Sequence, residues 1–194
     1  MERPKRQGCT SQMGMLDLIS QEIKSWSKEI LEKPLPLFAN MPPCPFARKA
    51  WLDKHVQIHV VKNLEQIIYI KNRLSPQDET VHVVAWTNWQ TTTKEQFEDW
   101  LDRKNKNHFG IWLMGFHPEA EDLEEISEFE GIVEDDYALI LVQSLDHLVK
   151  ASNKLMRTKY YDTSCKEDMD YINQRKEVHH AWKIKNNEEA YEKR

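Results

Sequence analysis

Three residues of this sequence combine reactive side chains with positions at which an α/β protein often places its chemistry. Cys44 lies between two prolines, where a proline-rich stretch enters a predicted short helix. A thiol at a helix N-terminus is expected to have a lowered pKa, and Arg48, one turn later, would favour the thiolate further. His117 follows an apolar stretch and precedes Pro118, so we expect it just past a strand end, as a general base or a metal ligand. We therefore predict a catalytic site between Cys44 and His117, with Arg48 orienting an anionic substrate. The alternatives are a buried structural thiol and a histidine that fixes a turn by hydrogen bonding.

Three further histidines belong to two predicted strands. His55 and His59 alternate with apolar residues in the first strand, and His82 lies among valines in the second. If the two strands pair in the right register, these imidazoles share one face of the sheet and are candidate ligands for Zn, Fe or Cu, with Cys44 or His117 completing the site. A register shift of one residue would separate them, and a solvated polar face is the alternative interpretation.

The charge of the chain is unevenly distributed. The 194 residues carry a formal net charge of −5. Ten carboxylates and no Lys or Arg lie between Glu119 and Asp136, and the remainder has 27 basic against 22 acidic side chains. Without the Asp-x-Asp order of a calcium loop, this acidic stretch is interpreted as a solvated cover that repels nucleic acid. We therefore expect no nucleic-acid partner.

Several classes of protein are excluded by what the sequence does not contain. Its five glycines form no GxGxxG or P-loop motif, which argues against the common nucleotide-binding enzymes. The three cysteines are far apart with no CxxC, as expected in a reducing compartment. No apolar run is long enough for a transmembrane helix, and the polar residues after the basic N-terminus do not fit a secretory signal. A cytoplasmic location without membrane contact is the expectation.

The apolar spacing predicts alternating helices and strands that would position these residues. Helices are expected over 15–32, 63–74, 93–103 and 145–157, with a short one after Phe46, and strands from His55 and over 80–86, 109–116 and 137–142. This order predicts an α/β or α+β fold, a ferredoxin-like (split βαβ) sandwich of about four strands. We divide the chain into an N-terminal helical arm (1–33), an α/β core domain (34–158) and a charged C-terminal tail or helix (159–194).

Several landmarks, in their order and spacing, resemble a known family. They are the run Cys44-Pro45-Phe46-Ala47-Arg48, the helix containing Phe97 to Leu101, the strand end Gly115-Phe116-His117-Pro118, and the segment from Asp136 to Leu148. Together they resemble DUF1415, a family of small bacterial cytoplasmic proteins without an assigned function. The resemblance covers about 110 residues, from Pro43 to Ser152. Pro43 stands where the family usually has leucine, and the family's Asn-Arg-Ser segment is missing. The resemblance implies a place for a site, around Cys44 and His117, and no particular reaction.

Two hypotheses of function follow from different classes. The first is a small cytoplasmic enzyme that acts on a small-molecule substrate by thiol-based or metal-assisted chemistry, between the Cys44 loop and His117. The second is a non-catalytic interaction module or oligomeric structural module, in which the first helix and the charged tail contact a partner. Homo-oligomerisation is left open.

Overall fold

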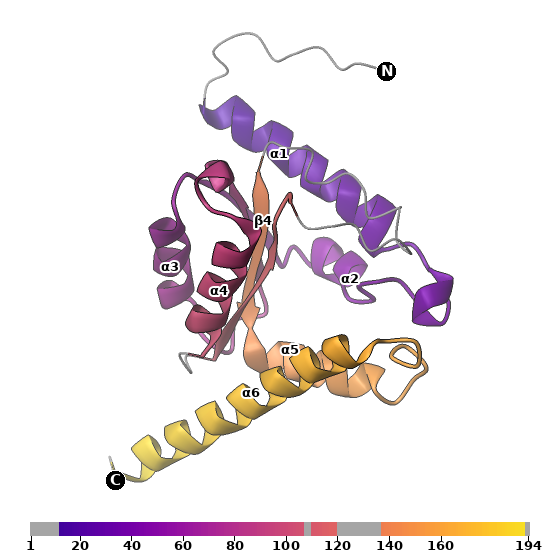
Figure 1. Ribbon diagram of the computed structural model, residues 1–194, viewed down its shortest axis with the longest axis vertical. Helices are drawn as coiled ribbons and strands as arrows, with labels where there is room; N and C mark the ends of the chain where they lie inside the picture. The colour runs from indigo at the N-terminus through magenta and orange to yellow at the C-terminus, as the bar shows by residue number, and fades with distance from the viewer. Residues whose placement is uncertain (1–11, 107–109, 120–136, 193–194) are drawn as a thin grey trace.

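The computed structural model describes residues 12–106, 110–119 and 137–192. In these ranges the chain forms one four-stranded mixed sheet with helices on both of its faces (Figure 1). The mixed α/β class and the four expected strands are confirmed. The acidic stretch that we interpreted as a cover lies outside the described residues, except for Glu119. In the described part of the chain, no helix is both long enough and apolar enough to cross a membrane.

The predicted elements are present, with bounds that differ by a few residues. The strands are β1 (Val56–Val61), β2 (Val81–Trp86), β3 (Ile111–Phe116) and β4 (Ala138–Ser144). The helices are α1 (Gln12–Trp26), α2 (Ala47–Leu52), α3 (Leu64–Arg73), α4 (Lys94–Asn105), α5 (Leu145–Leu155) and α6 (Lys166–Glu192). A π-helical turn (Ser27–Leu31) continues α1, and short 3₁₀ turns lie at Pro36–Phe38 and Trp89–Thr91.

The predicted helices over 63–74 and 93–103 correspond to α3 and α4, which begin after the capping residues Asn63 and Thr93. The Asn63 side chain accepts a hydrogen bond from the backbone N–H of Gln66, and the Gln66 side chain accepts one from the N–H of Asn63. Thr93 and Gln96 form the same reciprocal pair at the start of α4. Each of these reciprocal pairs, known as a capping box, supplies hydrogen-bond acceptors to two backbone N–H groups that have no partner within the helix. These two starts are therefore determined locally.

The sheet has the strand order β1-β2-β4-β3. β1 and β2 are parallel and joined through α3, while β4 is antiparallel to both β2 and β3. In the β1–β2 register Gln57 lies opposite His82, and His59 lies opposite Val84. Because residues two apart in a strand share a face, this register places His59 and His82 on the same face of the sheet.

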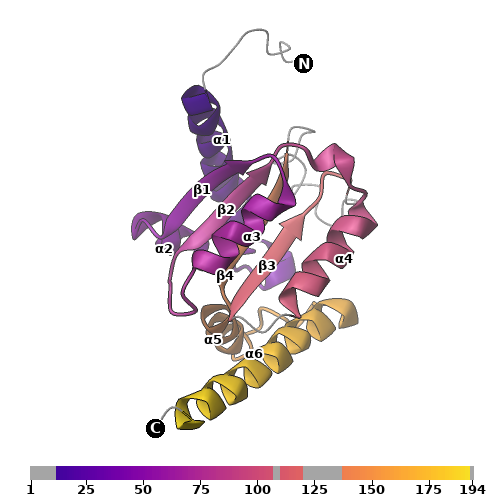
Figure 2. The same cartoon turned by 90° about the vertical axis from the view of Figure 1, so that its left-hand side faces the viewer.

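Alternate residues of β2 supply two separate cores. Val84 and Trp86 pack with Phe97 of α4 and Ile67 of α3 on one face of the sheet. Figure 2 shows α3 and α4 crossing this face. These four side chains are fully or nearly fully buried. The cluster to which they belong is the larger apolar core of the described residues.

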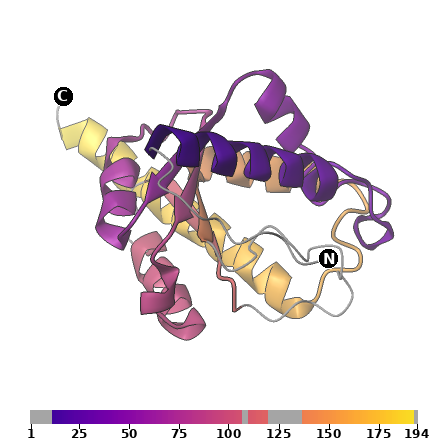
Figure 3. The same ribbon diagram turned by 90° about the horizontal axis from the view of Figure 1, so that it is seen from above.

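The opposite face of β2 packs against α1. Val83 and Ala85 form a cluster with Ile19 and Ile23 of α1, and Trp51 of α2 packs against it. Seen from above, α3 and α4 lie on one side of the sheet and α1 on the other (Figure 3). The N-terminal helix predicted as an arm thus covers one face of the core.

Helices α5 and α6 pack together near one end of the sheet (Figure 1). Leu145 and Val149 of α5 are buried with Trp112 of β3, and Tyr171 and Val178 of α6 pack against this cluster. The indole N–H of Trp112 donates a hydrogen bond to the Tyr171 hydroxyl at 2.9 Å. The charged tail predicted to be exposed therefore forms a helix with one buried side.

The two outer strands of the sheet, β3 and β1, differ in whether a side chain of the protein forms hydrogen bonds with their outer edge. At the β3 edge, the Asn105 amide donates to the carbonyl of Leu113 and its oxygen accepts from the N–H of Leu113, both at 2.8 Å. Asn105 is 4% exposed, so this side chain replaces a neighbouring strand inside the protein. β1 is the other edge strand and carries no charged residue between Val56 and Val61.

Candidate functional site

The loop that carries Cys44 is held by backbone hydrogen bonds beside the end of the π-helical turn. The N–H of Cys44 donates to the carbonyl of Leu31 at 3.0 Å. Burial raises the pKa of the Cys44 thiol, although the N–H groups of Phe46 and Ala47 act in the opposite direction. The expected helix N-terminal effect is therefore present, but loss of hydration outweighs it. The direction of the shift is opposite to the predicted one, so Cys44 resembles a structural thiol more than an activated one.

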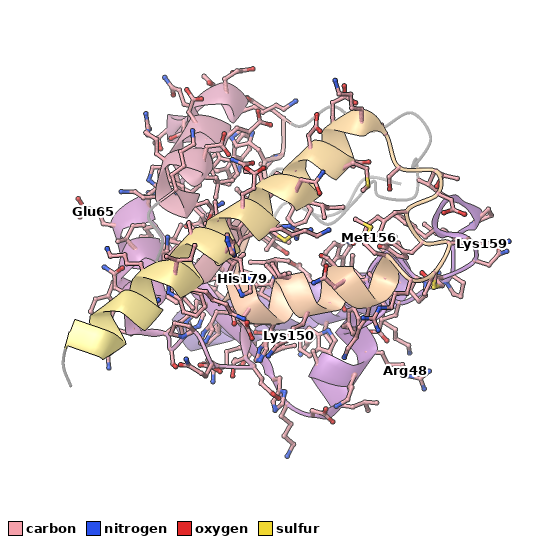
Figure 4. All side chains as sticks on the ribbon, turned by 90° about the horizontal axis from the view of Figure 1, so that it is seen from below. Arg48, Glu65, Lys150, Met156, Lys159 and His179 are labelled. Atoms are coloured by element: carbon pink, nitrogen blue, oxygen red, sulfur yellow. The ribbon has the colours of Figure 1, made fainter. Side chains whose placement is uncertain are left out.

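Arg48 does not join Cys44 in a common pocket. The residue is exposed on α2, and its side chain extends outward from the body of the protein (Figure 4). The neighbour of the thiol is instead Tyr160, whose hydroxyl donates to the carbonyl of Pro43 and whose ring stacks on Phe38 at a centroid distance of 5.0 Å. This packing explains why the Cys44 loop is half-buried.

His117 lies just past the end of β3, as predicted, and is 5% exposed. Its Nε2 lies 3.1 Å from the carbonyl of Thr92, and its Nδ1 lies 3.2 Å from the backbone N–H of Glu119. A neutral imidazole satisfies both when Nε2–H donates to Thr92 and Nδ1 accepts from Glu119. Its ring also packs against Trp89 and Phe97. Both nitrogens are thus engaged in hydrogen bonds that fix the turn, which is the structural role named above as the alternative.

The predicted shared site of Cys44 and His117 gains no geometric support. Cys44 precedes α2, whose Trp51 packs on the α1 side of the sheet. His117 contacts Phe97, which belongs to the core on the α4 side. Since the sheet separates these two layers, the two side chains lie in different environments.

Two of the three histidines predicted as a cluster do meet. The Nε2 atom of His59 lies 3.0 Å from the Nδ1 atom of His82, and the two rings stack at a centroid distance of 5.2 Å. His55 lies apart from them, with its Nδ1 3.8 Å from a carboxylate oxygen of Glu79. The alternation in the sequence thus predicted the shared face, and the β1–β2 register brought His59 and His82 into contact.

Asp78 lies behind this pair and favours one arrangement of its protons. The Nε2 atom of His82 is buried, has no hydrogen-bond partner, and lies 3.9 Å from Oδ2 of Asp78. A proton on Nε2 is favoured because it faces a carboxylate, and a lone pair there would be repelled. The Nδ1 atom of His82 then accepts a hydrogen bond from Nε2–H of His59. Nδ1 of His59 is left as the nitrogen whose lone pair can accept a proton.

Both imidazoles are shifted toward the neutral form. Burial lowers the pKa of His59, and the neighbouring His82 lowers it further. Burial also lowers the pKa of His82 and outweighs the opposite effect of Asp78. A neutral pair at physiological pH follows, with one nitrogen ready to accept a proton.

The donor set does not form a metal centre. Within the ranges that the structure describes, no three His, Cys, Asp or Glu side chains gather as metal ligands would. The facing nitrogens of His59 and His82 are at hydrogen-bond distance, and Asp78 approaches the other nitrogen of His82. Asp78 and His59 therefore lie on different sides of the His82 ring and do not face a common point. The expected Zn, Fe or Cu site of His55, His59 and His82 is not supported.

The sequence analysis missed a buried lysine and an ionic cluster. Lys71 of α3 is 4% exposed, and its ammonium donates to the carbonyl of Lys104 in the last turn of α4. Burial lowers the pKa of Lys71 to about 8. A cation at a helix C-terminus satisfies free carbonyls, which gives Lys71 a structural role. Its position one turn after Ile67 on the inner face of α3 was the signal available in the sequence.

The second missed group is an ionic cluster between α5 and α6. The Asp146 carboxylate is contacted by Lys150 at 2.6 Å, by His179 at 2.9 Å and by Lys183 at 3.1 Å. Figure 4 shows His179 of α6 and Lys150 of α5 on facing helices. The hydrogen bond from Lys150, followed by those from His179 and Lys183, holds the pKa of Asp146 well below its usual range. Asp146 thereby fixes α6 against the first turn of α5.

No family model matches the chain, and no curated protein or solved structure is significantly similar to it.

Proposed function

We propose that this protein is a small enzyme of general acid–base chemistry whose site is the His59–His82 pair with Asp78 behind it. One observation carries the proposal: the buried Nε2 of His82 has no hydrogen-bond partner and faces the Asp78 carboxylate, while Nδ1 of His82 meets His59. Buried polar atoms usually have hydrogen-bond partners, and this nitrogen instead has a carboxylate 3.9 Å away, which can stabilise a positive charge on the pair.

The proposed chemistry uses three side chains in sequence. His59 accepts a proton on Nδ1 from a substrate hydroxyl or from an attacking water, and becomes an imidazolium. Its Nε2–H donates to Nδ1 of His82, and Nε2–H of His82 points its positive end toward Asp78. The new charge is thereby stabilised by an oriented dipole and a carboxylate. The same proton returns to the leaving group, so the pair is regenerated.

The thiol-based and metal-assisted routes predicted from the sequence receive less support. The pKa of Cys44 is raised by burial, and a thiolate nucleophile needs the reverse. A metal-assisted reaction at His59 and His82 would need a third ligand on the side where their nitrogens face one another. General acid–base chemistry needs only the geometry that the pair has.

The proton arrangement itself is the first test. Two-bond ¹⁵N–¹H correlation spectra of the imidazoles should place protons on Nε2 of both His59 and His82, with pKa values below the ordinary histidine value of about 6.5. The matched variant Asp78→Asn removes the carboxylate that favours the charged form of His82, so it should lower the pKa of His82. A spectrum with the His82 proton on Nδ1 would remove the lone pair from His59 and end the proposal.

Reactivity is the second test. Hydrolysis of p-nitrophenyl acetate reports an accessible basic imidazole without knowledge of the natural substrate. We expect His59→Gln to abolish the pH-dependent rate above the buffer background, and His55→Gln, at the half-buried residue just before the same strand, to leave it unchanged. Added Zn²⁺ that binds stoichiometrically and is released by His59→Gln would favour the metal-assisted route instead.

The open edge of β1 favours a second proposal, a module for interaction or oligomerisation. The carbonyl of His55 accepts from Val81, and that of Val61 accepts from Thr87 of the segment after β2. In a parallel pair, residues of the opposite parity turn their backbone groups outward, here at Val56, Ile58 and Val60. Such an edge is a template for another strand.

Sedimentation of the full chain tests this second proposal. A dimer or larger species at micromolar concentration is expected, and Val60→Pro should dissociate it, because proline removes an outward N–H and leaves the β1–β2 ladder intact. A wild-type chain that remains monomeric, or a dimer that Val60→Pro leaves unchanged, excludes pairing through this edge.

Kinship with DUF1415 and with ferredoxin-like proteins remains part of these proposals. The strand order and directions of this sheet are the features that a related structure would have to share. A cytoplasmic location and a small-molecule substrate are likewise proposals, which agree with general acid–base chemistry on a soluble compound.

A further inference from the structure

A hollow of about 610 Å³ lies between α6 and the turn that precedes β2, separate from the histidine pair. Its lining residues are Pro76, Gln77, Trp182, Lys183 and Asn186. Small-ligand sites usually have volumes of roughly 300–1,000 Å³ and combine a flat apolar wall with a few polar groups. This lining has both components: an indole and a proline ring, an ammonium group and two amides.

The two apolar walls are fixed in place by the start of β3. Gly110 has φ +69°, and a Cβ atom at this position would lie 2.7 Å from Trp182 and 2.9 Å from Pro76. The hydroxyl of Ser144 donates a hydrogen bond to the carbonyl of Pro76. The Trp182 ring and the Pro76 turn therefore rest on Gly110 and are already in position before any ligand arrives.

The charge beside the hollow is positive. Lys183, which lines it, shares the Asp146 carboxylate with Lys150, so two ammonium groups are balanced by one carboxylate. The carboxylate of Asp78, next in the turn after Gln77, accepts from the N–H of Thr80 and lies near His82. The unbalanced charge attracts an anion to the Lys183 side of the hollow.

We propose that this hollow binds a small aromatic carboxylate. The ring of the ligand stacks on Trp182 against Pro76, the carboxylate pairs with Lys183, and the amides of Gln77 and Asn186 supply further hydrogen bonds. The site is independent of the histidine pair, and its test does not involve the proposed acid–base activity.

The test uses 2-naphthoate as the probe on the full-length protein, by isothermal titration and by the indole N–H shift of Trp182 in NMR spectra. We expect saturable binding at concentrations up to about 5 mM and about tenfold weaker binding by Lys183→Gln, a loss equivalent to about 1.4 kcal/mol. Lys185→Gln, two residues along the same helix, is the matched control and should bind as the wild type does. The neutral 2-naphthamide should bind more weakly and without dependence on Lys183.

Gln77→Ala, in the opposite wall, provides a variant that leaves the α5–α6 ion pairs in place and should also weaken binding. Circular dichroism confirms that each variant is folded. No saturable shift of the Trp182 indole in the wild type, or equal affinities for the wild type and Lys183→Gln, would overturn the proposal.

Discussion

Histidine and cysteine side chains acquire their properties in this protein from what surrounds them. Burial in the sheet lowers the pKa of both His59 and His82, and the neighbouring His82, 3.0 Å away, lowers that of His59 further. Cys44 loses hydration beneath Tyr160, which raises its pKa. The same cause, burial, favours the neutral form in each case, because a charge in a poorly hydrated site is unfavourable. In the neutral form an imidazole still has a lone pair that can accept a proton, whereas a neutral thiol is a poor nucleophile.

The histidine pair should make stability depend on pH. Above about pH 6.5 these histidines are neutral in both the folded and the unfolded chain. As the pH falls below this value, the unfolded chain binds protons that the folded pair resists, so stability is lost down through the lowered pKa values. We expect the double variant His59→Gln, His82→Gln to lose less stability than the wild type between neutral and mildly acidic pH.

Urea unfolding at about pH 7.5 and about pH 5 measures this difference, on either side of the ordinary histidine pKa. His180→Gln, at an exposed position of α6, is the control and should keep the wild-type dependence. An unchanged pH dependence in the double variant would assign the acid sensitivity to other groups.

Cys44 should react slowly with alkylating reagents. Burial limits both the access of the reagent and the fraction of thiolate, so we expect iodoacetamide to modify Cys44 at least about tenfold more slowly than a free cysteine peptide near neutral pH. The exposed Cys165 is the internal comparison and should react first. Peptide mass spectrometry gives both rates, and rapid labelling of Cys44 would restore the thiol-based hypothesis.

At the scale of the elements, Asn105 controls an edge of the sheet. It is the last residue of α4, and its side chain forms with the backbone of Leu113 the two hydrogen bonds that a fifth strand would otherwise form. The contrast with the open β1 edge indicates that the two ends of the sheet have different roles. One edge is closed within the chain, while the other keeps backbone groups available for pairing.

Asn105→Ala should leave a buried N–H and a buried carbonyl of Leu113 without partners. The expected loss of unfolding free energy is about 2–6 kcal/mol, at about 1–3 kcal/mol for each unsatisfied group. Chemical denaturation measures it, with exposed Asn173→Ala as a control expected within about 0.5 kcal/mol of the wild type. A loss below about 1 kcal/mol would indicate that water replaces the amide and that this edge is accessible.

On the scale of the whole molecule, the three segments suggested by the sequence pack against one another. The arm at residues 1–33 contributes Ile19 and Ile23 to the core beneath β2. The tail at residues 159–194 contributes Tyr171 and Val178 to the cluster around Trp112. The central segment 34–158 would expose both of these apolar surfaces without its neighbours.

A fragment of residues 34–158 should therefore fail to fold as the full chain does. We expect a broad, non-cooperative thermal transition and a tendency to aggregate, because the buried sides of α1 and α6 are missing. Calorimetry of the fragment and the full chain provides the comparison. A fragment with a sharp transition at the temperature of the full chain would establish 34–158 as an autonomous domain.

Local order was predictable from the sequence alone. The capping residues Asn63 and Thr93 determine where two helices begin, because their side chains bond to N–H groups only three residues away. The alternation around His59 and around His82 determined which residues could share a face. The stripe of Tyr171, Val178 and Trp182 at helical spacing also carried the information that the tail has a packed side.

Only the tertiary structure decided which of these elements meet. The insertion of β4 between β2 and β3, and the register that joins His59 to His82, depend on pairing between distant segments. The same holds for the different surroundings of Cys44 and His117, and for the burial that reverses the expected pKa shift of the thiol. Periodicity and capping act over a few residues, whereas hydration and contact depend on the whole chain, and the chemistry of these side chains follows from the latter.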